Sequence, residues 1–241
     1  MIAKGWFVCD RHFVEPFLDV TGKPRGVLFD LDGTLLDHRG AADAAVQEWT
    51  SRIVGVSLDA ATAVERWRLL EARYFTMFEQ RECTFQEQRR LRVRALAPTL
   101  SNLDDEAADE LFAAYQELYR RSWRPVAGAA EIVARAFTAG CRVGVLTNGD
   151  ESQQGDKLAA IGLAVPGLAL FASSALGCAK PDPRAFELAC SGLGTSAGET
   201  VMIGDDYAKD IVAARAAGLR AFQLTDGVTL AEIADDLFGE V

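Results

Sequence analysis

Short apolar runs and helical patterns alternate through the second half of the chain. Apolar runs typical of strands cover residues 26–30, 141–146, 200–203 and 220–224, and a further short apolar segment covers residues 168–171. Stretches with helical spacing lie between them, and two of these end at Gly140 and Gly218. Apolar runs without polar alternation are typical of parallel strands that are buried on both faces. The pattern therefore predicts an α/β fold, with a parallel sheet between two layers of helices.

A long helical stretch separates the first strand from the others. Between residues 41 and 123 apolar residues recur at steps of three and four, as Trp67, Leu70 and Tyr74 do, which is the spacing of one helix face. We interpret these residues as the core of the helices and not as a cofactor site. The predicted organisation is an irregular N-terminal arm over residues 1–24, an α/β core from residues 25–40 and 124–241, and a helical cap over residues 41–123.

Composition narrows the classes of partner. Apolar residues fill 49% of the 241 positions and charged residues 25%, as in ordinary globular proteins. The net charge of −10 opposes binding to nucleic acids and anionic membranes, so we expect neither as a partner. Five irregularly spaced cysteines predict free thiols, and no signal peptide or membrane-length apolar run is visible, which favours a cytoplasmic location. The oligomeric state stays open between monomer and homodimer.

Polar residues gather where the predicted strands end. They are Asp30, Asp32, Thr147, Asn148, Lys180, Asp205, Asp206 and Asp210. The carboxyl ends of parallel strands share one edge of a sheet, and ligands bind outside that edge. Several carboxylates there repel one another unless a hard cation joins them, and oxygen ligands without cysteine or histidine suit Mg²⁺. With a lysine and a threonine hydroxyl nearby, the set indicates phosphoryl transfer.

The order of these residues resembles the four motifs of the haloacid dehalogenase (HAD) superfamily. The motifs are the run Asp30-Leu31-Asp32-Gly33-Thr34-Leu35, then Thr147-Asn148, then Lys180-Pro181, then Gly204-Asp205 with Asp210. Most of these motifs alone would also fit an ordinary turn or loop, so the assignment rests on the whole set in order. The resemblance covers residues 26–226 and implies a Rossmann-like HAD core. The helical insertion between the first two motifs resembles the C1-cap subgroup.

The resemblance implies a Mg²⁺-dependent phosphomonoester hydrolase that acts on a small phosphorylated metabolite. Asp30 would attack phosphorus and form an aspartyl-phosphate. Asp32 would protonate the leaving oxygen and later deprotonate the water that hydrolyses the intermediate. Thr147 and Lys180 would hold the oxygens of the transferring phosphoryl group.

The same resemblance gives the remaining site residues supporting roles. The ligands implied for the metal are Asp30, the backbone carbonyl of Asp32, and Asp205, with Asp210 acting indirectly through them. Asn148 would donate a further hydrogen bond to phosphate, and Gly33 would permit close approach of the backbone. Asp206 departs from the family pattern, which often has Ser, Asn or Thr at this position, and its role is open.

Three other activities share parts of this pattern. A haloacid dehalogenase of the same fold displaces halide from carbon and usually has no acid at the position of Asp32, so Asp32 favours phosphate esters. A phosphosugar mutase of the same fold fits all four motifs. A receiver-like signalling module also phosphorylates an aspartate beside magnesium and a lysine, but such modules have about half this length and no helical insertion.

Some basic residues lie outside the motifs. His38 follows the first motif, where the chain leaves for the cap, and we interpret it as a surface or hinge residue. Residues 65–98 contain eight arginines, five glutamates and no lysine, which predicts a solvated helix face with Glu–Arg pairs four residues apart. A second interpretation has Arg89 or Arg92 facing the site and contacting an anionic substrate.

Overall fold

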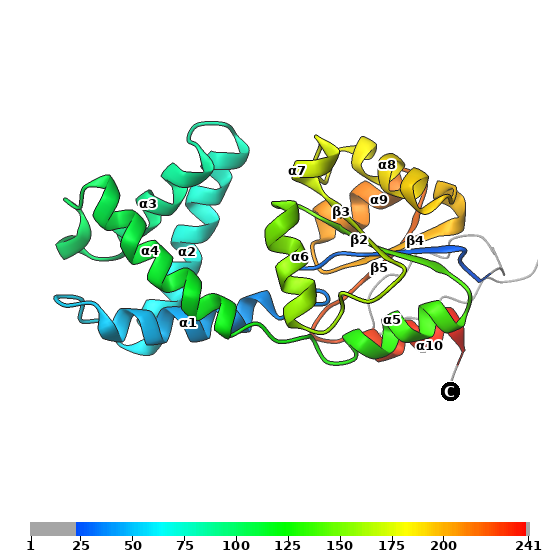
Figure 1. Cartoon of the computed structure of the whole chain (residues 1–241), viewed down its shortest axis with the longest axis horizontal. Coiled ribbons are helices and arrows are strands. Elements are labelled where there is room, and N and C mark those ends of the chain that lie inside the picture. Colours follow the sequence, from blue (N-terminus) through cyan, green and yellow to red (C-terminus); the bar gives the residue numbers. More distant parts are fainter. Residues whose placement is uncertain (1–22, 240–241) are drawn as a thin grey trace, which may run out of the picture.

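A five-stranded parallel sheet forms the centre of the α/β part of the molecule, as the computed structural model shows for residues 23–239 (Figure 1). Its strands are β1 (Gly26–Phe29), β2 (Arg142–Thr147), β3 (Leu168–Ala172), β4 (Thr200–Gly204) and β5 (Arg220–Gln223). They lie in the order β3-β2-β1-β4-β5, and all neighbouring pairs are parallel. The predicted arm over residues 1–24 falls mostly outside the described residues.

The register of the sheet brings three strand ends together. Phe29, the last residue of β1, lies opposite Val145 of β2 and Ile203 of β4. The residues that follow these strands therefore leave the sheet at one edge. This arrangement confirms the predicted fold class and the predicted grouping of the motifs at that edge.

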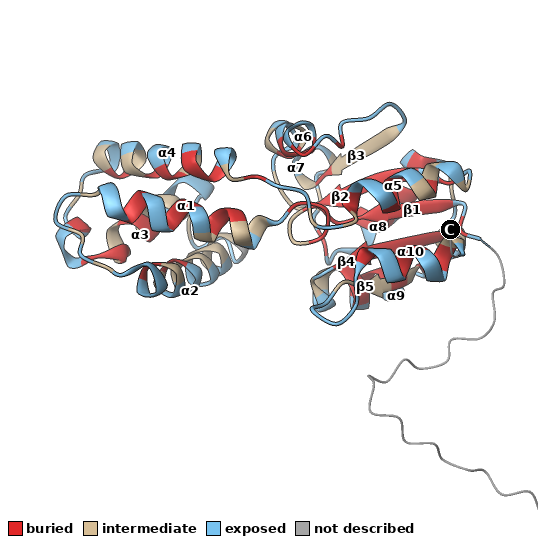
Figure 2. Cartoon of the chain, turned by 90° about the horizontal axis from the view of Figure 1, so that it is seen from below, coloured by how far each residue is buried: buried red, intermediate tan, exposed pale blue. Residues whose placement is uncertain are grey.

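Helices cover both faces of the sheet because its strands are apolar on both sides. Val27 and Phe29 point to the face covered by α5 (Ala129–Thr138) and α10 (Leu230–Phe238), whereas Leu28 points to the face covered by α8 (Pro183–Leu193) and α9 (Ala213–Ala216). Figure 2 shows β1, β2 and β4 mostly as buried and β3 mostly as intermediate, with α5 and α10 in front of the sheet. The shorter α7 (Ser173–Leu176) follows β3, and α6 (Glu151–Ala160) lies beside the carboxyl edge of the sheet.

Four helices form a separate lobe between β1 and α5, which we call the helical lobe. They are α1 (His38–Arg52), α2 (Ala60–Glu79), α3 (Phe85–Leu96) and α4 (Asp105–Arg121). Trp49, Trp67 and Tyr115 pack together at its centre, with the two indole rings 5.1 Å apart. These rings are core residues, as expected. The lobe occupies the place of the predicted cap, and its behaviour as a separate domain stays a prediction.

The arginines of the helical lobe pair between helices. Arg68 on α2 contacts Asp43 on α1, and Arg90 on α3 contacts Asp105 and Asp109 on α4. For these arginines the prediction of pairs four residues apart was wrong. The helices pack closely enough that acids of a neighbouring helix lie within reach of these long side chains.

Two further details of the fold bear on the predictions. Cys83, Cys141, Cys178 and Cys190 are free thiols, as expected. Among residues 23–239, no helix is both long enough and apolar enough to cross a bilayer.

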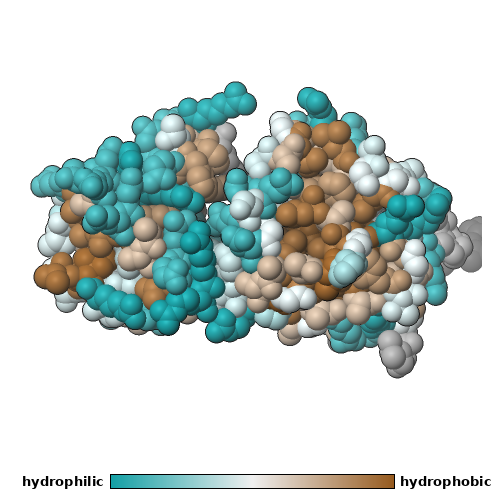
Figure 3. Space-filling model, in the orientation of Figure 1, coloured by the Kyte–Doolittle hydropathy of each residue, from teal (hydrophilic) through white to brown (hydrophobic). Residues whose placement is uncertain are grey.

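Seen from the side of Figure 1, the upper outline of the molecule is notched between the helical lobe and the sheet (Figure 3).

Candidate active site

The carboxyl edge of the sheet holds a buried carboxylate and a buried ammonium in direct contact. Asp30 follows β1, and its backbone NH donates to the carbonyl of Ile203 at 2.8 Å, so the sheet fixes its position. Lys180 Nζ donates to Asp30 Oδ1 and to Asp210 Oδ1, both at 2.6 Å. All three side chains are at least nine-tenths buried. The positive charge of the lysine compensates the cost of removing two carboxylates from water, which would be too high for the carboxylates alone.

Electrostatics at this edge leave an excess of negative charge. Burial raises the pKa of Asp30, Lys180 offsets part of the rise, and the charge of Asp210 adds to it. Burial and the charge of Asp30 raise the pKa of Asp205 to about 6. Burial alone would lower the pKa of Lys180, but the carboxylates of Asp30 and Asp210 outweigh it and raise that pKa.

The same carboxylates fit a divalent cation. Asp30, Asp205 and Asp210 each offer an oxygen, and these oxygens all lie within 4.8 Å of one another. An all-oxygen donor set with unbalanced negative charge suits a hard ion such as Mg²⁺. Asp210 belongs to this group although the resemblance gives it an indirect role, and its bond to Lys180 is compatible with that role. The carbonyl of Asp32 as a ligand stays a prediction.

The second and third motifs are joined by a pair of hydrogen bonds. Asn148 Nδ2 donates to the backbone carbonyl of Lys180 at 2.8 Å, and the backbone NH of Lys180 donates to Asn148 Oδ1 at 2.9 Å. Asn148 therefore fixes the loop that carries Lys180 at the carboxyl edge of the sheet. This leaves one hydrogen of its amide for the predicted bond to phosphate, which stays a prediction.

Thr147 lies at the end of β2 and is almost fully buried. Its Oγ1 accepts a hydrogen bond from Gln154 Nε2 at 2.6 Å. Because an amide NH₂ group can donate but not accept, the threonine's own hydroxyl hydrogen points elsewhere. Thr147 is thus prepared to donate to a ligand oxygen.

Asp32 lies in different surroundings from Asp30, although only Leu31 separates the two residues in the sequence. Lys157 Nζ donates to Asp32 Oδ1 at 2.7 Å and to Asp32 Oδ2 at 2.6 Å, and Gln154 Nε2 donates to Oδ2 at 3.1 Å. His38 Nδ1 lies 3.9 Å from Asp32 Oδ1. Burial alone would raise the pKa of Asp32, but the charges of Lys157 and His38 outweigh it and the pKa is lowered.

Gly33 allows the loop after β1 to approach Asp205. Its φ is +96°, and a Cβ at this position would lie 2.4 Å from Asp205 Oδ2. Thr34 Oγ1, in the same loop, donates to Asp205 Oδ1 at 3.3 Å. The predicted close approach at Gly33 is therefore made to the Asp205 carboxylate, and a contact with phosphate stays a prediction.

Asp206 caps a helical turn. Its Oδ1 accepts hydrogen bonds from the backbone NH groups of Ala208 at 3.0 Å and Lys209 at 2.9 Å. Ala208 and Lys209 are the second and third residues of the π-helical turn η3 (Tyr207–Val212), which precedes α9. The helical stretch that was predicted to end at Gly218 thus consists of two short elements, η3 and α9. The capping bonds supply a structural role for the acid whose function the sequence left open.

Sequence reasoning missed several groups that contact Asp32. Lys157 and Gln154 lie on α6, and both are buried. His38, which was interpreted as a surface or hinge residue, is the first residue of α1, and its side chain is 36% exposed. Its Nδ1 also lies 2.7 Å from Tyr119 Oη and 3.9 Å from Asp32 Oδ1. The available signal was the spacing of Gln154 and Lys157, which puts two polar residues on one face of a helix that follows the second motif.

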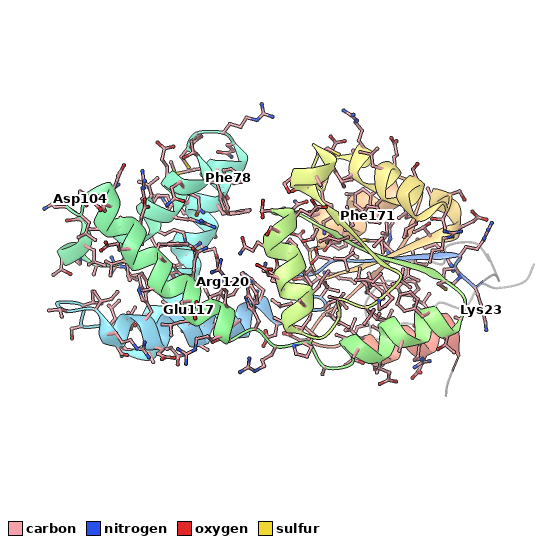
Figure 4. All side chains as sticks on the ribbon, viewed as in Figure 1. Lys23, Phe78, Asp104, Glu117, Arg120 and Phe171 are labelled. Atoms are coloured by element: carbon pink, nitrogen blue, oxygen red, sulfur yellow. The ribbon has the colours of Figure 1, made fainter. Side chains whose placement is uncertain are left out.

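The arginines predicted to contact a substrate lie in two different places. Arg92 is buried inside the helical lobe, where its Nη2 lies 2.8 Å from Glu71 Oε1. Arg89 lines a cavity of about 340 Å³ together with Arg120 of α4 and residues of α6. Figure 4 labels Arg120 on the side of the lobe that faces α6. Contact of Arg89 with a substrate therefore stays a prediction.

Relatives with known activities match long parts of the chain. A phosphoserine phosphatase of Thermus thermophilus is 37% identical over 124 residues, which span 51% of this chain and 49% of that protein. This chain thus matches about half of that relative's length. A phosphoglycolate phosphatase of Rhodospirillum rubrum is 29% identical over 88% of this chain and 83% of its own. An (S)-2-haloacid dehalogenase of Burkholderia cepacia is 30% identical over 76% and 75%.

Solved structures and a family model cover the same region. The HAD hydrolase YfnB of Bacillus subtilis, solved with bound magnesium, has a TM-score of 0.71 and 23% identity, covering 84% of this chain and 89% of that one. Identity at this level shows a shared fold. The family model for haloacid dehalogenase-like hydrolases matches residues 24–218, which include every site residue from Asp30 to Asp210. This chain therefore belongs to the haloacid dehalogenase-like hydrolase family.

Proposed function

We propose that this hydrolase is a Mg²⁺-dependent phosphatase that acts on small phosphorylated metabolites through an aspartyl-phosphate on Asp30. One observation carries the proposal. The carboxylates of Asp30 and Asp32, two residues apart, have separate partners: Lys180 for the first, and Lys157 with Gln154 for the second. Two acids in different surroundings suit two roles, a nucleophile and a proton carrier.

In the first step an oxygen of Asp30 attacks phosphorus. The bond from phosphorus to the substrate oxygen breaks, and that oxygen takes a proton from Asp32. Lys180 and the Thr147 hydroxyl bind the phosphoryl oxygens and stabilise their charge. This step needs a proton on Asp32, but Lys157 favours the ionised form of Asp32. The monoanion of a phosphate ester can supply that proton when it binds.

In the second step water attacks the phosphorus of the phospho-aspartate. Asp32, now ionised, accepts the proton of that water, the bond from phosphorus to Asp30 breaks, and inorganic phosphate is released. The residues proposed to hold magnesium are Asp30, Asp205 and the carbonyl of Asp32, with Asp210 beside them. When bound, the ion would neutralise charge on the phosphoryl oxygens.

The relatives support a small substrate. The printed names of two of them are phosphoserine phosphatase and phosphoglycolate phosphatase, and both names denote small phosphate esters. The helical lobe lies close to the carboxyl edge of the sheet, where a small ester could be shielded from water.

A dehalogenase activity is the second candidate, because one relative is a haloacid dehalogenase. Displacement of halide from carbon needs no proton on the leaving group. The acid at position 32 has a use in phosphate ester hydrolysis and none in that first displacement. We therefore prefer the phosphatase, and release of chloride from 2-chloropropionate would favour the dehalogenase.

A phosphate-release screen tests the proposal. We expect release from small phosphate esters and from p-nitrophenyl phosphate in Mg²⁺, loss of release in EDTA, and its recovery when Mg²⁺ is added back. Asp30→Asn should abolish release while the circular dichroism spectrum stays unchanged. Substantial turnover by Asp30→Asn, or full activity in EDTA, would contradict the mechanism. Isomerisation of hexose 1-phosphate primed with a bisphosphate would instead identify a mutase.

A further inference from the structure

A buried lysine on α6 contacts both oxygens of Asp32. Lys157 Nζ lies 2.7 Å and 2.6 Å from the two oxygens, and the Lys157 side chain is 6% exposed. The Nζ also lies 6.0 Å from the centre of the Tyr119 ring of the helical lobe. Burying an ammonium group is costly unless a partner offsets its charge, and within residues 23–239 Lys157 forms an ion pair with Asp32 alone.

Gln154 lies three residues earlier, on the same side of α6, and joins two motifs. Its Nε2 donates to Asp32 Oδ2 at 3.1 Å and to Thr147 Oγ1 at 2.6 Å. The amide oxygen could not take this place, because it would then face a carboxylate oxygen. One NH₂ group thus fixes the carboxylate after β1 against the hydroxyl at the end of β2.

We propose that Lys157 and Gln154 are positioning residues for the reaction. Lys157 fixes the plane of the Asp32 carboxylate by contacting both oxygens. Gln154 holds that carboxylate at a set distance from Thr147 and, by donating to Thr147, turns the threonine's hydroxyl hydrogen toward the phosphoryl group. The proposal rests on the proposed phosphatase mechanism, in which Asp32 transfers protons and Thr147 binds phosphate.

The alternative is a purely structural role, in which the Lys157–Asp32 pair attaches α6 to the loop after β1. The two roles differ in which step of the reaction a variant slows. The p-nitrophenolate group leaves without protonation, so attack by Asp30 on p-nitrophenyl phosphate does not need Asp32. Hydrolysis of the aspartyl-phosphate does need it. A misplaced Asp32 therefore slows the second step selectively, whereas local unfolding lowers both steps together.

The experiment is rapid-quench kinetics with p-nitrophenyl phosphate and Mg²⁺. For Lys157→Met we expect a burst of one p-nitrophenolate per active site, followed by turnover roughly 100-fold slower than that of the wild type, the cost of a misplaced catalytic group. With an alkyl phosphate, whose leaving group needs a proton, the burst should disappear. Lys157→Arg, which keeps the charge, should recover part of the turnover. Gln154→Met should also show a burst, with a slower burst phase because Thr147 loses its orientation, and with a smaller loss of turnover than Lys157→Met.

Leu158→Ala is the matched control, because Leu158 is a buried neighbour on α6 that belongs to the apolar core. It should lower the stability of the fold without producing a burst. Wild-type turnover by both Lys157→Met and Gln154→Met would overturn the inference, as would a loss in which burst and turnover fall together with the folded fraction. Asp32→Ala is the reference. If wild type releases no phosphate, or Asp32→Ala shows no burst, the proposed mechanism itself fails.

Discussion

At the scale of single residues, the site is defined by which charge each side chain contacts. Lys180 lies between the buried carboxylates of Asp30 and Asp210, and Lys157 pairs with Asp32. Each of the two acids Asp30 and Asp32 therefore forms an ion pair with its own lysine. The two functions proposed for these acids depend on keeping the lysines separate, so removal of each lysine should have its own consequence.

Lys180→Met should destabilise the fold strongly when no metal is present. The variant leaves Asp30 and Asp210 buried without their counter-charge, which costs about 3–5 kcal/mol. Urea unfolding in EDTA measures this loss, and added Mg²⁺ should restore part of it by binding to the uncompensated carboxylates. The double variant Lys180→Met with Asp210→Asn removes one of the two carboxylates and should be more stable than the single variant. Equal stability of Lys180→Met and wild type in EDTA would contradict this account.

Glu71 should make stability depend on pH. Burial alone would raise its pKa, but Arg92 and His38 outweigh burial and lower the pKa to about 2. A carboxyl group whose pKa is depressed on folding stabilises the fold above its unfolded pKa, about 4.5. That contribution disappears as the pH falls toward 2. The unfolding free energy of wild type should thus exceed that of Glu71→Gln at pH 6, and the difference should shrink below about pH 4.5 and vanish near pH 2.

Glu117→Gln supplies the control for this comparison. Glu117 is an exposed acid on α4 of the same lobe, labelled in Figure 4. The unfolding free energy of Glu117→Gln should stay close to that of wild type across the same pH range. A difference between wild type and Glu71→Gln that does not change with pH would show that the Arg92 contact does not stabilise the ionised acid.

At the scale of elements, the short helical turn η3 depends on Asp206, the residue just before it. Asp206 accepts hydrogen bonds from two backbone NH groups of the turn. Asp206→Ala should lower the unfolding free energy by about 1 kcal/mol, the usual cost of a lost N-cap, and Asp206→Ser should restore most of it. Phosphatase activity of Asp206→Ser should stay close to that of wild type. A large loss of activity in the serine variant at unchanged stability would show that the carboxylate acts on the metal or the substrate.

Elements also decide what could be predicted from the sequence. Asp30 and Asp205 directly follow apolar strands and Thr147 ends one, so a parallel sheet brings all three to one edge whatever the details of packing. Lys157 and Gln154 lie on a helix, where polar residues usually face solvent, and their burial depends on how α6 packs beside the loop after β1. The same dependence on packing explains why arginine pairs formed between helices and why the contacts of His38 with Asp32 and Tyr119 were not predicted.

At the scale of the whole molecule, the cavity between the helical lobe and α6 has opposite charges on its two sides. Arg89 and Arg120 line it from the lobe, and Asp150 and Asp156 line it from the sheet side. Arg89 lies over the ring of Phe85 at 4.2 Å, which limits its movement. Attraction across this cavity should favour approach of the lobe to α6, and we expect that approach to accompany substrate binding.

Charge reversal tests this expectation. Arg120→Glu should raise KM for a phosphate ester by up to about fivefold, because an exposed ion pair contributes at most about 1 kcal/mol. The value of kcat should change little, since Arg120 does not contact Asp30 or Asp32 in the described structure. Adding Asp156→Arg to Arg120→Glu reverses both charges and should bring KM back toward wild type, and 0.5 M salt should shrink the differences. If the double variant is as impaired as the sum of the two single variants, attraction between these side chains does not guide the movement of the lobe.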